Sequence, residues 1–211
     1  MQETKSSQKP FSAEDLLSAI TYLESMFFHS GGYAKTIWLI RHADAYDNLQ
    51  SRNEDIDNPG LSERGKMQAE KLAKRLEQFQ PELLISSPAK RAIQTAEIVG
   101  EHLGLKLEID QRFQEVMIEM PISTGHIKWL EDIAEVGMRV ENAIKEIAES
   151  SSATRIVIVS HGGAISALIS QVLGHGDGFL RLLPDYTSIT KLRYGNGKLV
   201  AYSLLDCCHL E

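Results

Sequence analysis

The sequence predicts an α/β protein of three layers (α/β/α), with helices on both faces of a mostly parallel central sheet and an N-terminal helical extension. Short apolar runs suited to buried strands alternate with amphipathic segments of helical period. The length of 211 residues fits one domain with an extension. Hydrophobic residues make up 43% and charged residues 24%, which is typical of a globular chain and argues against disorder.

The first 34 residues predict a polar tail and one amphipathic helix, and the domain itself is expected over 35–211. Ser12 and Asp15 resemble a capping box at a helix start. Apolar residues follow at three- and four-residue steps, at Leu16, Ile20, Leu23 and Phe27. Two interpretations stay open. The helix packs on its own domain, or it forms a contact with a partner or with a second copy of the chain, and the second copy would give a homodimer.

The elements of the domain follow in order from short apolar runs and helical periods. Strands are expected at 36–40 (TIWLI), 83–86, 106–109 and 156–159, with a terminal hairpin over 188–194 and 199–204. Helices are expected after Ser62, after Ser87 with Pro88 as first helical residue, across 133–147, and across 164–173. Gly104 should end the second of these helices.

Charge and cysteine content exclude several classes of protein. Lys plus Arg number 22 and Asp plus Glu number 29, a formal net charge of −7, so we expect no nucleic acid or anionic membrane surface as partner. Cys207 and Cys208 are adjacent and give no disulfide framework, which suits the cytoplasm. No run of eighteen apolar residues occurs, and the polar N-terminus does not resemble a signal peptide.

Two of the predicted strands end directly in a histidine. His42 follows the first strand, and His161 follows the strand at 156–159. The carboxyl ends of parallel strands share one edge of a sheet, so both rings should meet in one crevice. Arg41 adjoins His42, and Arg91 begins the helix after the second strand. Guanidinium groups bind phosphate oxygens, and a histidine serves as acid, base or nucleophile near neutral pH, so this cluster predicts phosphate chemistry.

Four segments in this order resemble the histidine phosphatase superfamily, which includes cofactor-dependent phosphoglycerate mutases and many phosphomonoesterases. They are LIRHADAYDN, LSERGKMQA, SSPAKRAIQTAEIV and IVIVSHGGAI, and the terminal TSITKLRY and CCHL look like the last strands of the family. The resemblance runs from about Thr36 to Leu210 and implies a phosphoglycerate mutase-like fold.

The resemblance implies a role for each matching residue. His42 would be the nucleophile that becomes phosphohistidine. Arg41, Arg91 and His161 would form the phosphate pocket, to which Asn48 would donate a further hydrogen bond. A neutral His42 needs an acceptor at its other ring nitrogen, and the sequence does not identify that acceptor. The chemistry requires no cofactor and no metal.

The leaving alkoxide needs a proton donor. In the family this is usually a glutamate after the third strand, and here Phe113-Gln114-Glu115 matches, so Glu115 is the expected acid and Glu119 the runner-up. Two positions depart from the family pattern. Ala43 replaces the usual glycine after the nucleophile, which would be strained if the backbone there needed a positive φ. Asp44-Ala45 replaces the usual Glu-Ser.

Within the superfamily, we expect a histidine acid phosphatase-type phosphoric monoester hydrolase. The alternatives are a phosphohistidine or phosphoprotein phosphatase, a phosphoglycerate mutase-type phosphotransferase, and a degenerate phosphate-binding interaction module. The apolar segment after Glu115, comprising Val116, Met117, Ile118, Met120 and Ile122 and joined by Trp129, either lines the leaving-group side or covers the sheet. The substrate would be a small phosphorylated molecule or a phosphopeptide.

Other enzyme classes find less support in the sequence. The turn after the first strand is not a Gly-x-Gly-x-x-Gly dinucleotide loop, and no P-loop occurs. No His-Glu-x-x-His occurs, and a basic pocket would repel a metal cation.

Overall fold

The computed structural model describes residues 18, 35–45, 58–119, 128–174 and 182–211. The chain divides into two units, residues 1–32 and 33–211, and every element below belongs to the second. Of the expected N-terminal helix only Ser18 is described, and it is helical. The rest of that segment, and any dimer contact it makes, lies outside the described residues.

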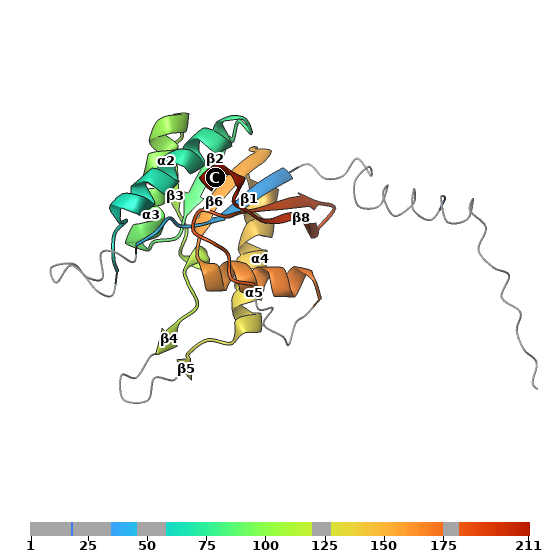
Figure 1. The fold of residues 1–211 in the computed structure, drawn as a ribbon. Coiled ribbons are helices and arrows are strands. Elements are labelled where there is room, and N and C mark those ends of the chain that lie inside the picture. Colours follow the sequence, from blue (N-terminus) through green and yellow to red (C-terminus); the bar gives the residue numbers. More distant parts are fainter. Residues whose placement is uncertain (1–17, 19–34, 46–57, 120–127, 175–181) are drawn as a thin grey trace, which may run out of the picture. The chain divides into compact units, whose positions relative to one another are not determined.

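A six-stranded sheet forms the centre of the second unit, in the order β3-β2-β6-β1-β7-β8 (Figure 1). Its strands are β1 (Lys35–Arg41), β2 (Leu83–Ser86), β3 (Leu107–Ile109), β6 (Arg155–Ser160), β7 (Ile189–Gly195) and β8 (Lys198–Asp206). β3, β2, β6 and β1 run parallel, and β7 and β8 form the predicted antiparallel hairpin beside β1. The predicted mostly parallel α/β sheet is confirmed.

Helices cover both faces of this sheet (Figure 1). They are α2 (Glu63–Glu77), α3 (Lys90–Leu103), α4 (Ile133–Ser150) and α5 (Gly162–Val172). Trp38 and Ile40 of β1 pack into one core with α2 and α3, whereas Ile37 and Leu39 pack into another with α4 and α5. This alternation follows from the two-residue period of a strand, and it produces the predicted three layers.

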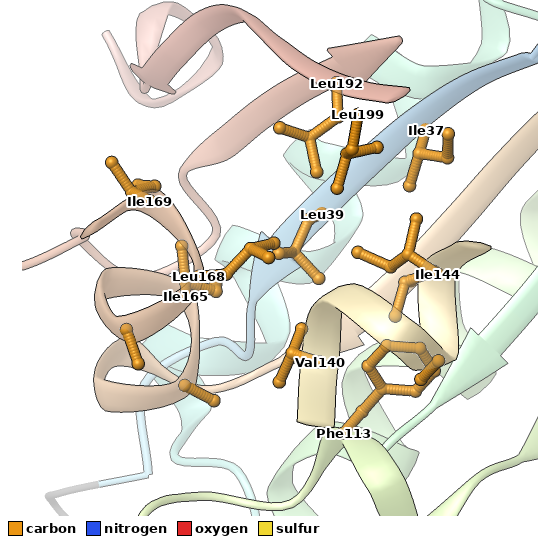
Figure 2. Close-up of a cluster of buried hydrophobic side chains, with 14 of the residues drawn as sticks. Ile37, Leu39, Phe113, Val140, Ile144, Ile165, Leu168, Ile169, Leu192 and Leu199 are labelled. Atoms are coloured by element: carbon orange, nitrogen blue, oxygen red, sulfur yellow. The ribbon is translucent and has the colours of Figure 1, made fainter. Parts of the chain in front are cut away.

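The core on the α4 and α5 side is the larger of the two (Figure 2). Leu39 lies between Val140 of α4 and Leu168 of α5, and none of these three side chains is exposed to solvent. Burying each such side chain contributes about 2 kcal/mol. The core therefore holds the ends of β1 and β6 in place, and those two ends carry the histidines.

The helix ends agree with the sequence at two places and differ at a third. Ser62 caps α2 by accepting a hydrogen bond from the Gly65 amide, and Gly104 ends α3 in a left-handed conformation (φ 67°). The prediction that Pro88 is the first helical residue is wrong, because α3 begins at Lys90. The preceding Ser87 instead directs its hydroxyl to His161.

Two short features were not expected from the sequence. β4 (Ile118–Glu119) and β5 (Lys128–Trp129) form an antiparallel pair, and strands of two residues are too short to show a period. The CCHL segment is not a last strand: η4 (Cys208–Leu210) is a 3-10 helix. Leu205, the next-to-last residue of β8, has a φ of 57°, and the carboxylate of Asp206, which ends the strand, accepts a hydrogen bond from the Cys208 amide.

Among the helices that the structure describes, none is long and apolar enough to cross a membrane.

Candidate active site

The parallel pairing of β1 with β6 brings the two histidines together. Arg41 is opposite Ser160 in the register, so the next residue of each strand leaves the sheet at the same edge. The ring centroids of His42 and His161 are 5.1 Å apart, and both side chains are buried. The site therefore lies at the carboxyl ends of the central strands, where α/β sheets bind ligands.

His42 is held by its own backbone neighbour. Its Nδ1 lies 2.8 Å from the Ala43 carbonyl oxygen, which only a protonated Nδ1 can use as a hydrogen-bond acceptor. Nε2 then carries the lone pair and accepts a hydrogen bond of 3.1 Å from Nε of Arg91. The Ala43 carbonyl is thus the acceptor that the sequence left unidentified, and it selects the tautomer suited to attack by Nε2.

The pKa of His42 is lowered to about 3, first by burial and then by the nearby Arg91 and Arg41 charges, against the hydrogen bond to Ala43, which raises it. The pKa of His161 is also lowered well below its usual value, first by burial and then by His42 and Arg91. Both imidazoles are therefore neutral at physiological pH.

Arg91 bridges the two rings. Its Nε donates to His42, and its Nη2 lies 3.2 Å from Nδ1 of His161. The Nε2 atom of His161 lies 2.7 Å from the Ser87 hydroxyl, so both nitrogens of that ring have protein partners. Ser87 was expected only as a helix start; its place just after a strand end was the one available signal for this role.

Arg41 presents a guanidinium with free donors. Its Nη1 donates to the Pro184 carbonyl at 2.6 Å, and its Cζ lies 4.1 Å from the Tyr186 ring centroid. Nε is buried without a hydrogen-bond partner, and no donor other than Nη1 makes a hydrogen bond to the described residues. The edge formed by Nε and Nη2 can therefore bind two oxygens of a phosphate. Sequence reasoning missed Tyr186, which lies in no recognised motif.

Glu115 lies at the N-terminus of α5, next to the residues after His161. Its Oε1 accepts hydrogen bonds from the amides of Val116 (2.9 Å) and Ala164 (3.0 Å), and its Oε2 accepts a longer one from Gly163 (3.3 Å). A Cβ on Gly163 would lie 2.7 Å from Oε1, so the close approach requires glycine. Oε2 is the oxygen with fewer partners, and it is the better placed to carry a proton.

The other predicted site residues are placed only in part. Asn48 lies outside the described residues. The backbone of Glu119 is in β4, but its side chain is outside the described part of the chain. Val116 packs in the core, and Met117 is about half exposed. Val116 therefore covers the sheet, and the other apolar side chains after Met117 are not described.

Ala43 carries no backbone strain, since it is not among the described residues with a positive φ. It is fully buried, and its amide donates to the Thr95 hydroxyl at 3.0 Å. Thr95 is a further residue that the sequence did not single out. Within the described residues, no group of three or more His, Cys, Asp or Glu side chains could hold a metal ion.

The geometry places a histidine pair and two arginines at the carboxyl edge of an α/β sheet, the arrangement that the resemblance to a known family implies. The sequence pattern of the histidine phosphatase superfamily (branch 1) matches residues 37–120 and 122–206. The chain belongs to this superfamily.

Similar proteins include both phosphatases and mutases. Phosphoserine phosphatase 1 of Hydrogenobacter thermophilus is 30% identical over 197 residues, which cover 82% of this chain and 92% of that protein. "Probable phosphoglycerate mutase GpmB" of Yersinia enterocolitica is 28% identical over 171 residues, covering 69% and 80%. The solved structure of YhfR from Bacillus stearothermophilus has a TM-score of 0.69 at 22% identity, covering 84% and 100%. These matches support phosphatase or mutase activity.

Proposed function

We propose that the protein is a phosphoric monoester hydrolase of the histidine acid phosphatase type, which acts through a phosphohistidine on His42. One observation carries this proposal: Nε2 of the neutral, buried His42 carries the lone pair and accepts a hydrogen bond from the guanidinium of Arg91, and Arg41 ends the same strand that His42 follows. A nucleophile among cationic donors is the arrangement that phosphoryl transfer requires.

In the first step Nε2 of His42 attacks the phosphorus, and the bond between phosphorus and the leaving oxygen breaks. The donors of Arg41, Arg91 and His161 would stabilise the charge on the phosphoryl oxygens, with Asn48 adding a further donor. Glu115 would give the proton on Oε2 to the leaving oxygen, so that an alcohol departs.

In the second step water attacks phospho-His42. Glu115, now a carboxylate, would take the proton from this water as its oxygen bonds to phosphorus and the nitrogen–phosphorus bond breaks. Inorganic phosphate leaves, and His42 returns to its neutral form. Proton and phosphoryl group are thus both accounted for over the cycle.

The substrate we propose is a small phosphorylated molecule or a phosphopeptide. A phosphorylated hydroxyl like that of phosphoserine is supported by the relative named phosphoserine phosphatase. Action on phosphohistidine or phosphoprotein is the first alternative, and phosphotransfer of the mutase type is the second, supported by the relative named as a mutase. A degenerate phosphate-binding module is the third. A cytoplasmic location and a homodimer stay predictions.

Hydrolysis of p-nitrophenyl phosphate by the purified protein, beside His42→Ala, tests the proposal. We expect turnover by the natural chain and none by the variant. Acid-labile, alkali-stable labelled phosphate should be trapped on the natural chain alone, because a nitrogen–phosphorus bond hydrolyses in acid. Equal activity of the two proteins would contradict the phosphohistidine mechanism, and binding of phosphate without turnover would favour the degenerate module.

A further inference from the structure

We propose that Arg139 and Glu131 are positioning residues for proton transfer, because together they hold the chain segment that carries Glu115. The inference rests on the proposed function, in which Glu115 is the acid. Neither residue contacts the phosphate pocket residues by a hydrogen bond among the described contacts. Their main effect on the reaction would pass through the backbone of residues 112–117, and the Arg139 charge also helps to lower the pKa of His161.

Arg139 lies on α4 and binds this segment by its carbonyl groups. Its Nη1 donates to the carbonyl oxygen of Arg112 at 2.7 Å and to that of Gln114 at 3.2 Å. Gln114 directly precedes Glu115. A guanidinium group is planar and rigid, so two carbonyls bound to one of its nitrogens are held in a defined relation.

Glu131 binds the other side of the same segment. Its Oε2 accepts a hydrogen bond of 2.8 Å from the amide of Met117, two residues after Glu115. The same oxygen lies 3.7 Å from Nη2 of Arg139, and both side chains are about one-fifth exposed. Arg139 and Glu131 therefore form an ion pair, and they bind the backbone of the segment before and after Glu115.

The segment needs such support because residues 114–117 belong to no helix or strand. A sheet or helix would have satisfied their backbone groups and fixed their positions. Backbone partners serve only the Gln114 amide and the Met117 carbonyl, which pair with Gln111 and Leu130. Side chains hold the segment otherwise, and just before it the Ser160 hydroxyl donates to the Phe113 carbonyl at 2.8 Å, between the two carbonyls that Arg139 binds. Ser160 directly precedes His161, so the same contacts link the acid segment to the second histidine.

The consequence for the reaction is selective. A displaced Glu115 would still leave His42, Arg41 and Arg91 in place, so attack on phosphorus would continue. Formation of the phosphohistidine would then slow only for substrates that need a proton at the leaving oxygen, whereas the later water step, which also uses Glu115, would slow equally for all substrates. A misplacement of about 1 Å costs on the order of 100-fold in rate.

The test compares two aryl phosphates that differ in the leaving group. Phenyl phosphate needs protonation of its leaving oxygen, whereas p-nitrophenyl phosphate departs without it. We expect Arg139→Gln to lower kcat/KM, which reports phosphohistidine formation, by about 10- to 100-fold for phenyl phosphate and by less than about 3-fold for p-nitrophenyl phosphate. Glu131→Gln should act in the same direction with a smaller effect, because a glutamine oxygen still accepts from Met117.

The matched control is Glu146→Gln, which makes the same chemical change at another link between this region and α4. Glu146 binds Nη1 of Arg112 at 2.7 Å but is 71% exposed and touches no backbone group of 112–117. We expect it to leave both substrates unchanged, as an exposed ion pair contributes little. Arg139→Lys should recover part of the lost phenyl phosphate turnover, since lysine can still donate to one carbonyl.

Equal loss on both substrates, or no loss on either, would overturn the positioning role of Arg139. Glu115→Gln separates that failure from failure of the proposed function. If Glu115→Gln is selective for phenyl phosphate and Arg139→Gln is not, only the positioning role falls. If Glu115→Gln is itself not selective, the acid role falls and the positioning role falls with it. In Glu115→Gln/Arg139→Gln the second change should add almost nothing, and full additivity would also contradict the proposal.

Discussion

The ends of β1 and β6 carry the same residue in the same relation to a strand, yet the two histidines have different partners. His42 takes a hydrogen-bond acceptor from the next residue, Ala43, and turns its lone pair to Arg91. His161 has both ring nitrogens bound by distant side chains, Ser87 and Arg91. The two rings therefore share Arg91 and differ in the second partner, which is a backbone carbonyl for His42 and a side-chain hydroxyl for His161. The carbonyl fixes the lone pair of His42 on Nε2, the atom proposed to attack.

The largest expected effect tests directly whether the two histidines have different roles. His42→Ala should lower kcat by about 10⁴-fold or more and remove the trapped phosphoenzyme, because no nucleophile remains. His161→Gln should cost about 100- to 1000-fold and still yield a phosphoenzyme. Turnover and acid-labile labelled phosphate are measured for both. Trapping on His42→Ala but not on His161→Gln would mean that the two histidines have exchanged roles.

A smaller effect should follow from loosening His161 alone. Ser87→Ala removes the partner of Nε2 and should lower kcat/KM by about 10-fold, the effect typical of a residue that orients a functional histidine. Thr95→Val is the matched change beside His42. We expect a smaller effect there, because the nucleophile keeps its own acceptor at Ala43. Steady-state kinetics give kcat/KM for both variants. An unchanged kcat/KM in Ser87→Ala would contradict the role of Ser87 in orienting His161.

The two glycines after His161 offer a matched pair. A Cβ on Gly163 would lie 2.7 Å from Oε1 of Glu115, whereas one on Gly162 would meet only ordinary contacts of 3.4 Å or more. Gly163→Ala should therefore lower phenyl phosphate turnover by about 10-fold through displacement of the acid, and Gly162→Ala should have little effect. Identical kinetics of the two variants would show that Glu115 tolerates the shift.

The smallest effect concerns stability against pH. The pKa of His42 is about 3 in the folded protein and about 6.5 when unfolded. Between these values the unfolded chain binds a proton that the folded one does not, so stability falls as pH falls, on the order of 1 kcal/mol per pH unit.

His42→Gln removes this contribution, and urea unfolding at pH 7.5 and pH 5 should show a weaker loss for the variant than for the natural chain. The lowered pKa of His161 acts in the same direction; burial and Arg91 keep it lowered in the variant, while the part due to His42 is lost together with the titration of His42. Parallel pH dependence of the two proteins would contradict a buried, neutral His42.

Much of the fold could be predicted because its signals are local. The continuous apolar runs of β1 and β6, the cap at Ser62 and the helix end at Gly104 are each visible within a few residues. The β4–β5 pair could not be, since it is too short to show a period. The predicted start of α3 was wrong, and no local pattern shows that the Ser87 hydroxyl instead hydrogen-bonds to His161, 74 residues along the chain.

By itself the sequence determined that this is an α/β protein with two histidines and two arginines gathered at one edge of a sheet, because hydrophobic period and strand direction are properties of neighbouring residues. Only the tertiary structure decided which partner each ring nitrogen has, which donors of Arg41 remain for a ligand, and what holds Glu115. Those features are hydrogen bonds between side chains and backbone far apart in sequence. Their partners are set by how the layers pack, and no local pattern encodes that packing.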